Sequence, residues 1–497
     1  MAKRYLLGID VGTTATKTLL LNEQGAVVDS ASQSYELITP EIGRCEQNAV
    51  DWWNAVVYTV RKVLEEGRSE CVQAISLSTQ GGTIVPTDAE FNPLANAIVW
   101  SDARCAGDKK IFDEALGKDY IYNTCGWRHS RGLPAMQLYR MKRENPGIFA
   151  SATYFLSVPD YISAKLTGIP AIDISNAGIN ELTDIKNRVY DKKILDFIGV
   201  REEQLPKLVV SGTPIGKLTK AAAEVLGLNE NVILCAGAHD QYAVAQGAGI
   251  CEAGDAIIGT GTAWVVTALQ NEPDFESGYP QSLSATEGKW GTVLSITTGG
   301  VCLEWFRKNV VGTEDHPLDF DTINRLAAEC DTPGVGGLRF FPYFTGAGNP
   351  VADPNCKGTF LGIDLSHGKA HIIRAIMEGV ACQIVWAMQV LSERHPIERL
   401  MIAGGATKSP VWLQIIAEIA GRELYVSDVA DLACVGAGML AGVGCGMFAD
   451  NQEAAKAMRP EQHIVKPDPQ HAEAYKKVFE DYCRGAKALR SLYNKGV

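Results

Sequence analysis

The sequence contains no pair of cysteines at the spacing that zinc sites and redox motifs use. Its 13 cysteines are scattered along the chain, and no two of them form a C-x-x-C pair. An odd number of scattered cysteines in a large chain is typical of reduced thiols in the cytoplasm. We therefore expect no structural zinc and no disulfide framework, and we predict a cytoplasmic location.

No stretch of the sequence has the pattern expected of a signal peptide or a membrane span, and basic residues are not in excess. The first apolar run is broken at Asp10, which predicts a buried strand instead of a signal peptide. The run VGAGMLAGVGCGMFA near the end is too short and too glycine-rich to span a bilayer, and it predicts close helix packing. The formal net charge of −12 disfavours nucleic acid and anionic membrane as partners, and it is compatible with a local basic pocket for a phosphorylated ligand.

Several common catalytic motifs are also absent. The chain has no Walker A loop, no G-x-G-x-x-G loop, no H-E-x-x-H motif and no nucleophile elbow. Its composition, with 46% hydrophobic and 21% charged residues, is that of a folded globular protein. Because 497 residues are too many for one ordinary core, we expect two domains, over residues 1–252 and 253–497.

The order of the first elements predicts an α/β fold with a mixed sheet. A turn at Gln24-Gly25 is expected, and a helix from Ala49 to Glu66 with Asn48 as its cap. The following strand ends at Ser78. Three earlier strands are expected over Tyr5–Val11, Thr16–Asn22 and Ala26–Ser32. Strands that precede and follow a helix in this way are typical of α/β proteins.

Later segments continue the alternation. Val232–Ala236 is expected to be a buried strand that runs into a glycine-bounded turn and then a helix. The stretch SVPDYISAKLTG predicts a helix stopped by Gly168, and SHGKAHIIRAIMEGVACQIVWAMQVL has apolar residues at helical spacing. The stretch LMIAGGATKSPVWLQIIAEIAG predicts a strand, a Gly-Gly turn and a helix.

One pattern occurs twice, near the start of each half of the chain. LLGIDVGTTATKTLLLN and DAIIGTGTAWVVTALQ both hold an apolar run, a Gly-Thr core and a second apolar run. Gly12-Thr13 corresponds to Gly261-Thr262, or to Gly259-Thr260 under a shifted register. Gly-Thr turns between strands are common, so one match carries little weight. Two similar units at these positions favour duplicated domains that face each other.

Three glycine-rich turns could hold a phosphate, because backbone amides in such turns can converge on an anion. They are Gly12–Thr14, Gly259–Thr262 and Gly404–Ala406. The last precedes a predicted helix, whose N-terminus would favour a phosphate or a ribose-phosphate edge. For each turn taken alone, the alternative is a purely structural role.

Two acids lie at the ends of predicted buried strands. Asp10 could cap its own Gly-Thr turn, or it could position Mg²⁺ beside transferring phosphates. Asp240, in AGAHDQYA, could be a helix N-cap, or it could be a general base for a sugar hydroxyl. His239 beside it is expected to be structural.

At these residues the sequence resembles the FGGY family of carbohydrate kinases, within the actin-like ATPase superfamily. Among its members it looks most like the xylulokinases. The resemblance covers nearly the whole chain in order, and its most specific part is the G-x-F-x-G-I stretch that leads into RAIMEGVA. Other matching stretches are GIDVGTTATKTLLLNEQGAVV, EQNAVDWWNAV, AIVWSDARC, PDYISAKLTG, AGAHDQYAVAQGAG, IGTGTAW, FFPYFTG and AGGATKSPVWLQIIAEIAG.

The resemblance implies two ribonuclease-H-like domains with mixed sheets and a cleft between them, and it implies ATP and Mg²⁺ as cofactors. Asp10 matches the acid that orients metal and phosphate, and Asp240 matches the base that deprotonates the acceptor hydroxyl. The implied phosphate and adenosine contacts are Gly12, Thr13, Thr14, Lys17, Gly261, Thr262, Gly404, Gly405 and Ala406. The implied sugar contacts are Gln80, Gly81, Trp100, Asp102, Arg104 and Gln241.

The implied reaction is ATP-dependent phosphorylation of a small sugar or polyol, with a ketopentose such as xylulose as first candidate. The sugar side departs from the xylulokinase pattern, since Gln-Met-His-Gly is replaced here by STQGGT. WSDAR agrees with ketopentose kinases, whereas Asp240-Gln241 resembles the glycerol-kinase pair. Ribulose, glycerol, a tetritol, gluconate or a related hydroxylated signal molecule are alternative substrates. An actin- or chaperone-like ATPase switch is the alternative from another class, and a homodimer is the assembly left open.

Overall fold

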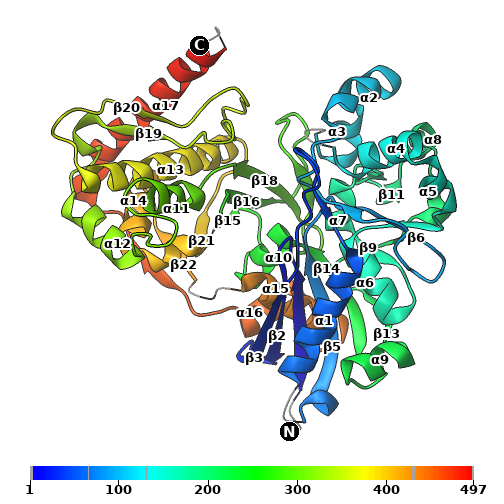
Figure 1. The fold of residues 1–497 in the computed structure, drawn as a ribbon. Coiled ribbons are helices and arrows are strands. Elements are labelled where there is room, and N and C mark those ends of the chain that lie inside the picture. The colour runs from blue at the N-terminus through cyan, green and yellow to red at the C-terminus, as the bar shows by residue number, and fades with distance from the viewer. Residues whose placement is uncertain (1–3, 65–66, 129–131, 428, 430, 495–497) are drawn as a thin grey trace. The chain divides into compact units, whose positions relative to one another are not determined.

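The computed structural model of the chain describes residues 4–64, 67–128, 132–427, 429 and 431–494. They form two compact units, each with its own sheet and helices (Figure 1). The first unit comprises Met1–Ala253, Leu269–Thr292 and Asp431–Pro460, and the second comprises Gly254–Ala268, Val293–Ala430 and Glu461–Val497. The expected two-domain α/β class is confirmed.

The first unit is built on a six-stranded mixed sheet. β1 lies at its centre, antiparallel to β2 and parallel to β5, which is in turn parallel to β14. In sheet order the strands are β13 (Pro214–Lys217), β14 (Ile233–His239), β5 (Val72–Thr79), β1 (Tyr5–Val11), β2 (Ala15–Asn22) and β3 (Val27–Ser34). The strands expected near the start of the chain are therefore confirmed, each within two residues.

Helix α1 (Ala49–Val63) covers this sheet with an apolar face that includes the fully buried Trp52. The Asn48 side chain accepts a hydrogen bond from the Val50 amide, so the expected N-cap is confirmed. The predicted end at Glu66 lies outside the described residues. The helix ends earlier, at Val63, with Leu64 as its C-cap. α6 (Val158–Thr167) packs beside it, and Gly168, with φ 75°, ends that helix as expected.

The predicted glycine-bounded turn after Val232–Ala236 was wrong. β14 continues through Gly237 to His239, and α10 (Asp240–Gly247) follows directly. The physical reason is that Gly237 lets β14 approach β5 at a register shift, since a Cβ there would lie 1.7 Å from the Leu77 carbonyl oxygen. Asp240 is thereby placed directly at the end of a buried strand.

Close helix packing at VGAGMLAGVGCGMFA is confirmed. This stretch forms most of α15 (Leu432–Gly444), which packs on α10 and on the central strands of the first unit. A Cβ at Gly436 would lie 2.0 Å from the Ala243 carbonyl oxygen, and one at Gly247 would lie 2.0 Å from the Leu432 carbonyl oxygen. The two helix backbones therefore touch where both lack side chains.

The first unit also contains shorter helices and strand pairs. Its remaining helices are α2 (Lys109–Leu116), α3 (Tyr120–Cys125), α4 (Pro134–Glu144), α5 (Pro146–Ser151), α7 (Ile174–Ile179), α8 (Lys192–Ile198), α9 (Lys220–Leu226) and α16 (Asn451–Met458). The strand pairs are β4 (Glu46–Gln47) with β7 (Ala97–Ile98), β6 (Val85–Thr87) with β8 (Tyr154–Leu156), β9 (Ala171–Asp173) with β12 (Lys207–Val209), and β10 (Thr183–Asp184) with β11 (Val189–Tyr190). β17 (Gln281–Leu283) pairs with the first half of β18 (Trp290–Ile296).

The second unit repeats the strand order of the first. Its sheet has seven strands, and after β17 at the edge the order is β18, β16 (Trp264–Gln270), β15 (Asp255–Thr260), β21 (Arg399–Gly404), β22 (Leu424–Val426) and β23 (His463–Val465). β15 is antiparallel to β16 and parallel to β21, as β1 is antiparallel to β2 and parallel to β5. Gly261 follows the last residue of β15 as Gly12 follows the last residue of β1, so the unshifted register of the repeat is the one observed.

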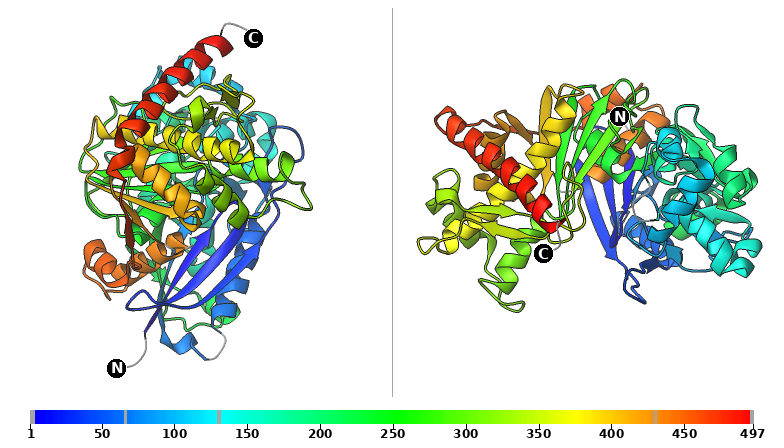
Figure 2. Two further views of the ribbon diagram at one scale, coloured as in Figure 1. Left: turned by 90° about the vertical axis from the view of Figure 1, so that its left-hand side faces the viewer. Right: turned by 90° about the horizontal axis from the view of Figure 1, so that it is seen from above.

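Helices surround the sheet of the second unit: α11 (Gly300–Asn309), α12 (Phe320–Glu329), α13 (Lys369–Ser392), α14 (Pro410–Ala420) and α17 (Ala472–Tyr493), with the pair β19 (Arg339–Phe341) and β20 (Thr359–Leu361). Within the described chain, α13 alone is long and apolar enough to cross a membrane, and 78% of its most apolar stretch is buried. It packs against α12, α14 and α17, and Figure 2 shows α17 as one long helix at the C-terminal end. Burial of this kind is typical of the core helix of a globular unit.

Candidate active site

The predicted residues of the first unit gather at one edge of its sheet. Asp10 on β1 pairs with Ser78 on β5, and Ser78 pairs with Ala238 on β14. These three strands are parallel, so their carboxyl ends lie together, and Gln80 and Asp240 follow directly after two of them. Ligands of α/β proteins bind at this edge of parallel strands.

Asp10 is held by its neighbour on β5. Ser78 Oγ donates a hydrogen bond of 2.7 Å to Asp10 Oδ1. Desolvation by the surrounding protein raises the pKa of Asp10 to about 7, which the Ser78 bond and Lys17 counteract and the charge of Asp240 reinforces. The hydrogen bond of Asp10 thus goes to the neighbouring strand, and the alternative role of capping its own Gly-Thr turn was wrong.

The Gly12–Thr14 loop is fixed from behind through its carbonyl groups. Tyr35 Oη donates to the Gly12 oxygen at 2.5 Å, and Gln47 Nε2 donates to the Thr13 oxygen at 2.6 Å. The Tyr35 amide donates to the Thr14 oxygen. In each planar peptide the N–H points opposite to the C=O, so the amides of Thr13 and Thr14 are directed away from these partners. This arrangement can bind an anion.

Lys17 lies on β2 directly beyond this loop and forms an ion pair. Its Nζ is 2.6 Å from Asp431 Oδ1, and both side chains are partly exposed, at 44% and 28%. Burial opposes the charge of Lys17, but the bond to Asp431 more than offsets it, so the pKa of Lys17 is raised. Asp431 occupies the N-cap position of α15 but makes no side-chain capping bond, so its carboxylate is directed to Lys17.

Thr13 connects the loop to the predicted sugar contacts. Its hydroxyl donates to Gln80 Oε1 at 3.1 Å and accepts from Trp100 Nε1 at 3.1 Å. Gln80 Nε2 in turn donates to Gln47 Oε1, the residue that also holds the loop. Gly81 continues the turn beside Gln80, and Trp100 remains 42% exposed. The structure therefore brings Thr13, Gln80 and Trp100 into one polar network.

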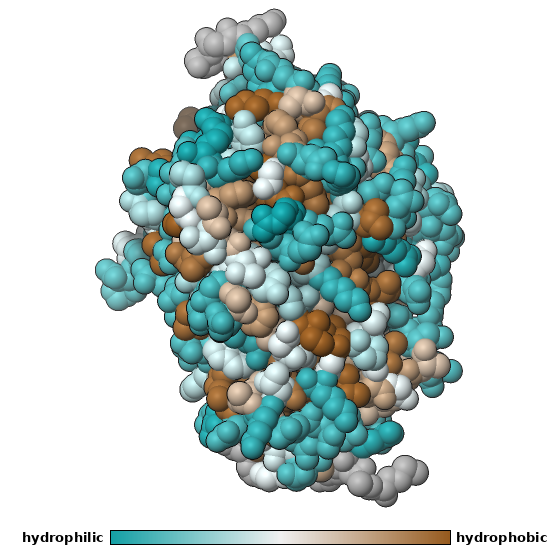
Figure 3. Space-filling view, turned by 90° about the vertical axis from the view of Figure 1, so that its right-hand side faces the viewer, coloured by the Kyte–Doolittle hydropathy of each residue, from teal (hydrophilic) through white to brown (hydrophobic). Residues whose placement is uncertain are grey.

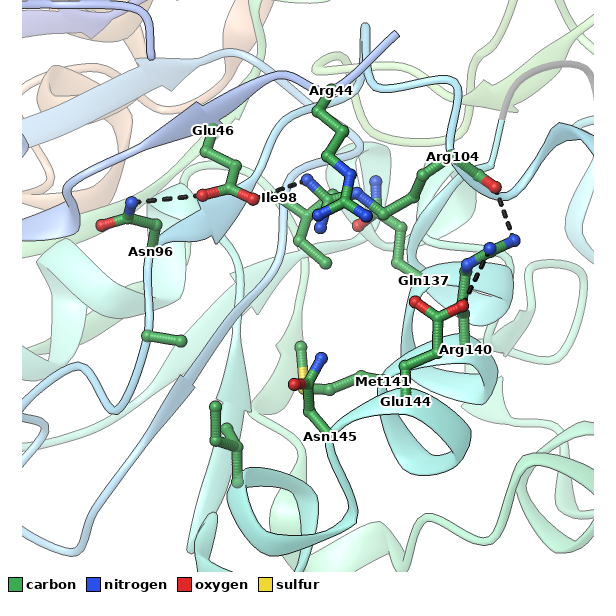
Figure 4. Close-up of a pocket in the computed structure, with 12 residues that line it drawn as sticks. Arg44, Glu46, Asn96, Ile98, Arg104, Gln137, Arg140, Met141, Glu144 and Asn145 are labelled. Atoms are coloured by element: carbon green, nitrogen blue, oxygen red, sulfur yellow. Dashed lines mark hydrogen bonds and ion pairs between the residues drawn. The ribbon is translucent and has the colours of Figure 1, made fainter. Parts of the chain in front are cut away.

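Asp102 and Arg104 are bonded mainly to one another. The buried Asp102 accepts the Cys45 and Arg104 amides and both ends of the Arg104 guanidinium. Arg104 also pairs with Glu46 at 2.7 Å. Arg104 and Glu46 line a cavity of about 260 Å³, and Figure 4 shows Arg44 and Arg140 around it as well. The polar atoms of Asp102 and Arg104 thus brace the segment that follows Trp100.

Asp240 begins α10, and its side chain is partly exposed. Its residue is the first of the helix, with His239 in the N-cap position and no side-chain capping bond, so the N-cap alternative was wrong. In the described part of the chain, Asp240 Oδ1 has no hydrogen-bond partner, although the side chain is 35% exposed. Gln241 follows on the same helical turn. Oδ1 lies 3.3 Å from His239 Nδ1, and a partly exposed carboxylate that is not used in a helix cap is suited to accept a proton from a bound ligand.

In the second unit, the Gly261-Thr262 loop has the same construction as the first. The amides of Gly299 and Val301 donate to the Thr262 oxygen, and the Gly300 amide donates to the Gly261 oxygen. Because these carbonyl oxygens are hydrogen-bonded to residues 299–301, the amides of the same peptides, those of Thr262 and Ala263, point away from that segment. Both residues of the loop are exposed.

The Gly404–Ala406 segment lies beside that loop, because Thr260 pairs with Gly404. Thr260 Oγ1 donates to the Ala403 oxygen and accepts from the Ala406 amide. The predicted order of a strand, a Gly-Gly turn and a helix is confirmed: β21 ends at Gly404, a 3₁₀ turn follows over Gly405–Lys408, and Ser409 caps α14. Gly404 and Gly405 are exposed, while Ala406 is buried.

Sequence reasoning missed the residues that hold the predicted ones. Tyr35, Gln47, Ser78 and Asp431 each bond to a loop or side chain of the site. Ser78 could have been found from the expected strand end, had the pairing of β1 with β5 been known. Asp431 lies 414 residues from Lys17, and no local pattern links the two.

Comparison with known proteins identifies the family. The N-terminal domain of the FGGY family of carbohydrate kinases matches residues 5–247, and its C-terminal domain matches residues 255–445. The chain belongs to this family. It is therefore a carbohydrate kinase, a phosphotransferase that acts on a sugar or polyol, as the sequence predicted.

Individual FGGY relatives are similar over almost their whole length. A gluconokinase of Bacillus licheniformis is 27% identical over 500 residues, covering 99% of this chain and 97% of that protein. A xylulose kinase of Bacillus subtilis (strain 168) is 28% identical over 484 residues, covering 96% of each. The crystal structure of a gluconate kinase from Lactobacillus acidophilus superposes with a TM-score of 0.91 at 24% identity and covers 100% of both chains. The fold is that of these kinases, whose named substrates differ.

Proposed function

We propose that the protein transfers the γ-phosphate of ATP to a hydroxyl of a small sugar or polyol, with a ketopentose such as xylulose as first candidate. The observation that carries this proposal is the convergence of Asp10, the Gly12–Thr14 loop and the partly exposed carboxylate of Asp240 at one sheet edge. Phosphoryl transfer requires alignment and charge neutralisation more than covalent help from the protein. The amides of the phosphate loop and the Lys17 ammonium would supply the charge neutralisation, and the Asp240 carboxylate would align the acceptor hydroxyl.

In this proposal Asp240 is the general base. Its carboxylate orients the acceptor hydroxyl and takes its proton as the oxygen attacks phosphorus. Gln80, Gly81, Trp100 and Gln241 would bind the sugar, with Asp102 and Arg104 holding Trp100 in place. The amides of Thr13 and Thr14 and the Lys17 ammonium would bind phosphate oxygens.

Asp10 fits a divalent cation. Its carboxyl group accepts one hydrogen bond from Ser78, and its pKa is raised to about 7 by the surrounding protein, so a bound cation would stabilise the charged form. We propose Mg²⁺, which prefers carboxylate, water and phosphate oxygens. When bound, it would neutralise charge on the transferring phosphoryl group.

The two parts of the chain would divide the task. Residues 1–252 would supply the sugar site, the first phosphate loop and Asp240. Residues 253–497 would supply the second loop at Gly261-Thr262 and the nucleotide contacts at Gly404, Gly405 and Ala406. The described construction of both loops, with carbonyls held from behind, supports this assignment.

Gluconate is the second candidate substrate, since gluconokinases are among the similar proteins. The test is a coupled ADP-release assay with Mg²⁺ and ATP over xylulose, ribulose, gluconate, glycerol and a tetritol, with mass spectrometry of the products. We expect ADP release that depends on one of these compounds and yields its monophosphate. ATP hydrolysis that is equally fast without any of them would overturn the proposal and favour an ATPase switch.

A further inference from the structure

His239 lies between two parts of the proposed site. It is the last residue of β14, occupies the N-cap position of α10, and directly precedes Asp240. Its residue is 6% exposed, and its Nδ1 lies 3.3 Å from Asp240 Oδ1. At this distance the buried imidazole can donate a hydrogen bond to the carboxylate of the proposed base.

The two facing atoms have no other partners. In the described part of the chain, neither His239 Nδ1 nor Asp240 Oδ1 forms a hydrogen bond with any other group. Buried polar atoms without partners are rare in folded proteins. Hydrogen bonds at catalytic groups are often long before substrate binds and shorten in the reacting complex. An Nδ1–H directed at the Asp240 carboxylate would satisfy both atoms.

The backbone and ring of His239 are fixed by their surroundings. Its amide donates to Ser175 Oγ at 2.9 Å, and Ser175 donates to the buried Asp173. The imidazole also contacts two aromatic rings, with centroid distances of 6.2 Å to Trp127 and 5.8 Å to Tyr242. The position of the ring relative to Asp240 therefore does not depend on a bound ligand.

The absence of a side chain at Gly81 makes room for this imidazole. A Cβ at Gly81 would lie 2.5 Å from His239 Cδ2 and 2.9 Å from its Nε2. Gly81 is one of the proposed sugar contacts, so the far edge of the ring lies against the sugar-binding turn. The residue type at position 81 and the imidazole at position 239 are thus sterically linked.

We propose that His239 is a positioning residue for Asp240. Its Nδ1–H holds Oδ1, which directs the second carboxylate oxygen toward the acceptor hydroxyl. The proton of that hydroxyl passes to Asp240, the hydroxyl oxygen forms the new bond to phosphorus, ADP leaves, and His239 keeps its own proton throughout. This inference rests on the proposed role of Asp240 as base.

Three substitutions separate this role from a structural one. Asn presents an amide N–H near the place of Nδ1, Gln presents one near the place of Nε2, and Phe keeps the ring without a donor. We expect His239→Asn to keep most of the turnover. His239→Gln and His239→Phe should each lower kcat about 10- to 100-fold, the usual effect of losing a hydrogen bond to a charged group, with the KM for ATP unchanged.

A second measurement uses the steric link. Gly81→Ala should lower kcat in the otherwise unchanged protein, because it displaces the imidazole, and should add little to His239→Ala. The positioning role is overturned if His239→Gln matches or exceeds His239→Asn, or if His239→Phe turns over like the unsubstituted enzyme. If the unsubstituted enzyme itself shows no substrate-dependent ADP release, the proposed function fails instead, so the two failures are distinct.

Discussion

Asp10 and Ser78 occupy paired positions on the neighbouring parallel strands β1 and β5, and Ser78 Oγ donates to Asp10 Oδ1 at 2.7 Å. The surrounding protein raises the pKa of Asp10 to about 7, and the Ser78 bond lowers it. The charge of Asp10 near neutral pH is therefore sensitive to the loss of one hydroxyl group. If Asp10 must be ionised to orient the metal and phosphate, this sensitivity extends to the rate.

Ser78→Ala should move the acidic limb of the rate profile to higher pH. Without the hydroxyl, the pKa of Asp10 rises further, and a smaller fraction of the carboxyl is ionised at pH 7. We expect a displacement of about one pH unit, corresponding to the loss of one hydrogen bond to a charged group. The measurement is kcat/KM for the sugar between pH 5 and 9, and the rate deficit should be largest at low pH.

Ser76→Ala is the matched control for this experiment. Ser76 is buried on the same strand, two residues before Ser78, and its Oγ has no hydrogen-bond partner in the described part of the chain. Its profile should coincide with that of the unsubstituted enzyme. Identical profiles for both alanine variants would contradict the role of Ser78.

Asp10→Asn should stabilise the protein at high pH. Because the folded pKa of Asp10 lies above the ordinary value of 3.8, its protonated form contributes stability that is present at low pH and lost as the pH rises through about 7. Asn stays neutral and avoids this loss. In metal-free buffer we expect the Tm of the variant to exceed that of the unsubstituted protein at pH 8.5, and the difference to disappear near pH 4.

Asp29→Asn should change the stability at high pH in the opposite direction. Asp29 accepts a hydrogen bond from Arg68 at 2.6 Å, which lowers its pKa, so its charged form contributes stability that is lost as the pH falls. This variant should be less stable than the unsubstituted protein at pH 8.5. If Asp10→Asn showed the same sign as Asp29→Asn, the raised pKa of Asp10 would be disproved.

Asp240→Asn should nearly abolish turnover. An amide cannot take the proton of the acceptor hydroxyl, and general-base catalysis typically contributes about 10²- to 10⁴-fold to a rate. ATP binding, measured by calorimetry, should be nearly unchanged, because the proposed nucleotide contacts lie on other segments. The comparison is Asp191→Asn, at the start of α8, where the carboxylate caps the helix by accepting from the Ile194 amide.

The capping variant separates chemistry from helix stability. Asp191→Asn should change the free energy of unfolding by less than about 1 kcal/mol and leave kcat unaltered. Asp240 has no capping bond, so its substitution should alter kcat with little change in stability. Equal kcat values for Asp240→Asn and Asp191→Asn would show that Asp240 is not the general base.

Lys17→Met should weaken nucleotide binding more than it destabilises the fold. The pair with Asp431 is partly exposed, and such pairs contribute at most about 1 kcal/mol to stability. Loss of a charged phosphate contact should raise the KM for ATP about tenfold or more. The control is Lys192→Met, which removes an exposed ammonium paired with Asp196 on α8. If the two methionine variants had the same KM for ATP, Lys17 would not contact the nucleotide.

The sequence predicted well those features that depend on short-range patterns. Short apolar runs predicted the strands around Asp10, and a polar residue before an amphipathic helix predicted the Asn48 cap. The repeated Gly-Thr turn predicted a second unit built like the first, which the strand order bears out. Each strand, cap and turn depends on residues within a few positions of each other, and the repeat follows from comparing two such short stretches.

Contacts between residues far apart in the chain could not be predicted from the sequence. The partner of Asp10 is 68 residues away, and the partner of Lys17 is 414 residues away. The end of β14 was also misplaced, because Gly237 is in the strand for a close approach to Leu77 and not for a turn. The sequence alone does not distinguish a glycine in a turn from a glycine at which two strands approach closely; the position of the neighbouring strand does.

The positions of apolar groups on the surface could not be predicted from composition either. Figure 3 shows one face of the molecule, on which apolar side chains lie in small groups among hydrophilic ones. More than half of a typical protein surface is apolar, so scattered groups of this kind are ordinary. The position of each group depends on packing, which residue counts do not record.

Gly436→Ala should lower both stability and turnover. A Cβ at this position would lie 2.0 Å from the Ala243 carbonyl oxygen on α10, so the two helices must separate. Forced overpacking of this kind costs about 1–3 kcal/mol. Since α10 begins at Asp240, the displacement should also misplace the proposed base and lower kcat. Urea denaturation and the ADP-release assay measure the two effects on the same preparation.

Gly147→Ala is the matched control, because it also adds a methyl group to a helical glycine of the first unit. Gly147 lies in α5, and a Cβ there would meet no atom within 4 Å. Replacing an exposed helical glycine by alanine usually stabilises a protein, by about 0.5–1 kcal/mol. We therefore expect a small rise in the denaturation midpoint and an unchanged kcat. A Gly436→Ala protein as stable and as active as Gly147→Ala would show that α10 and α15 can separate without moving Asp240.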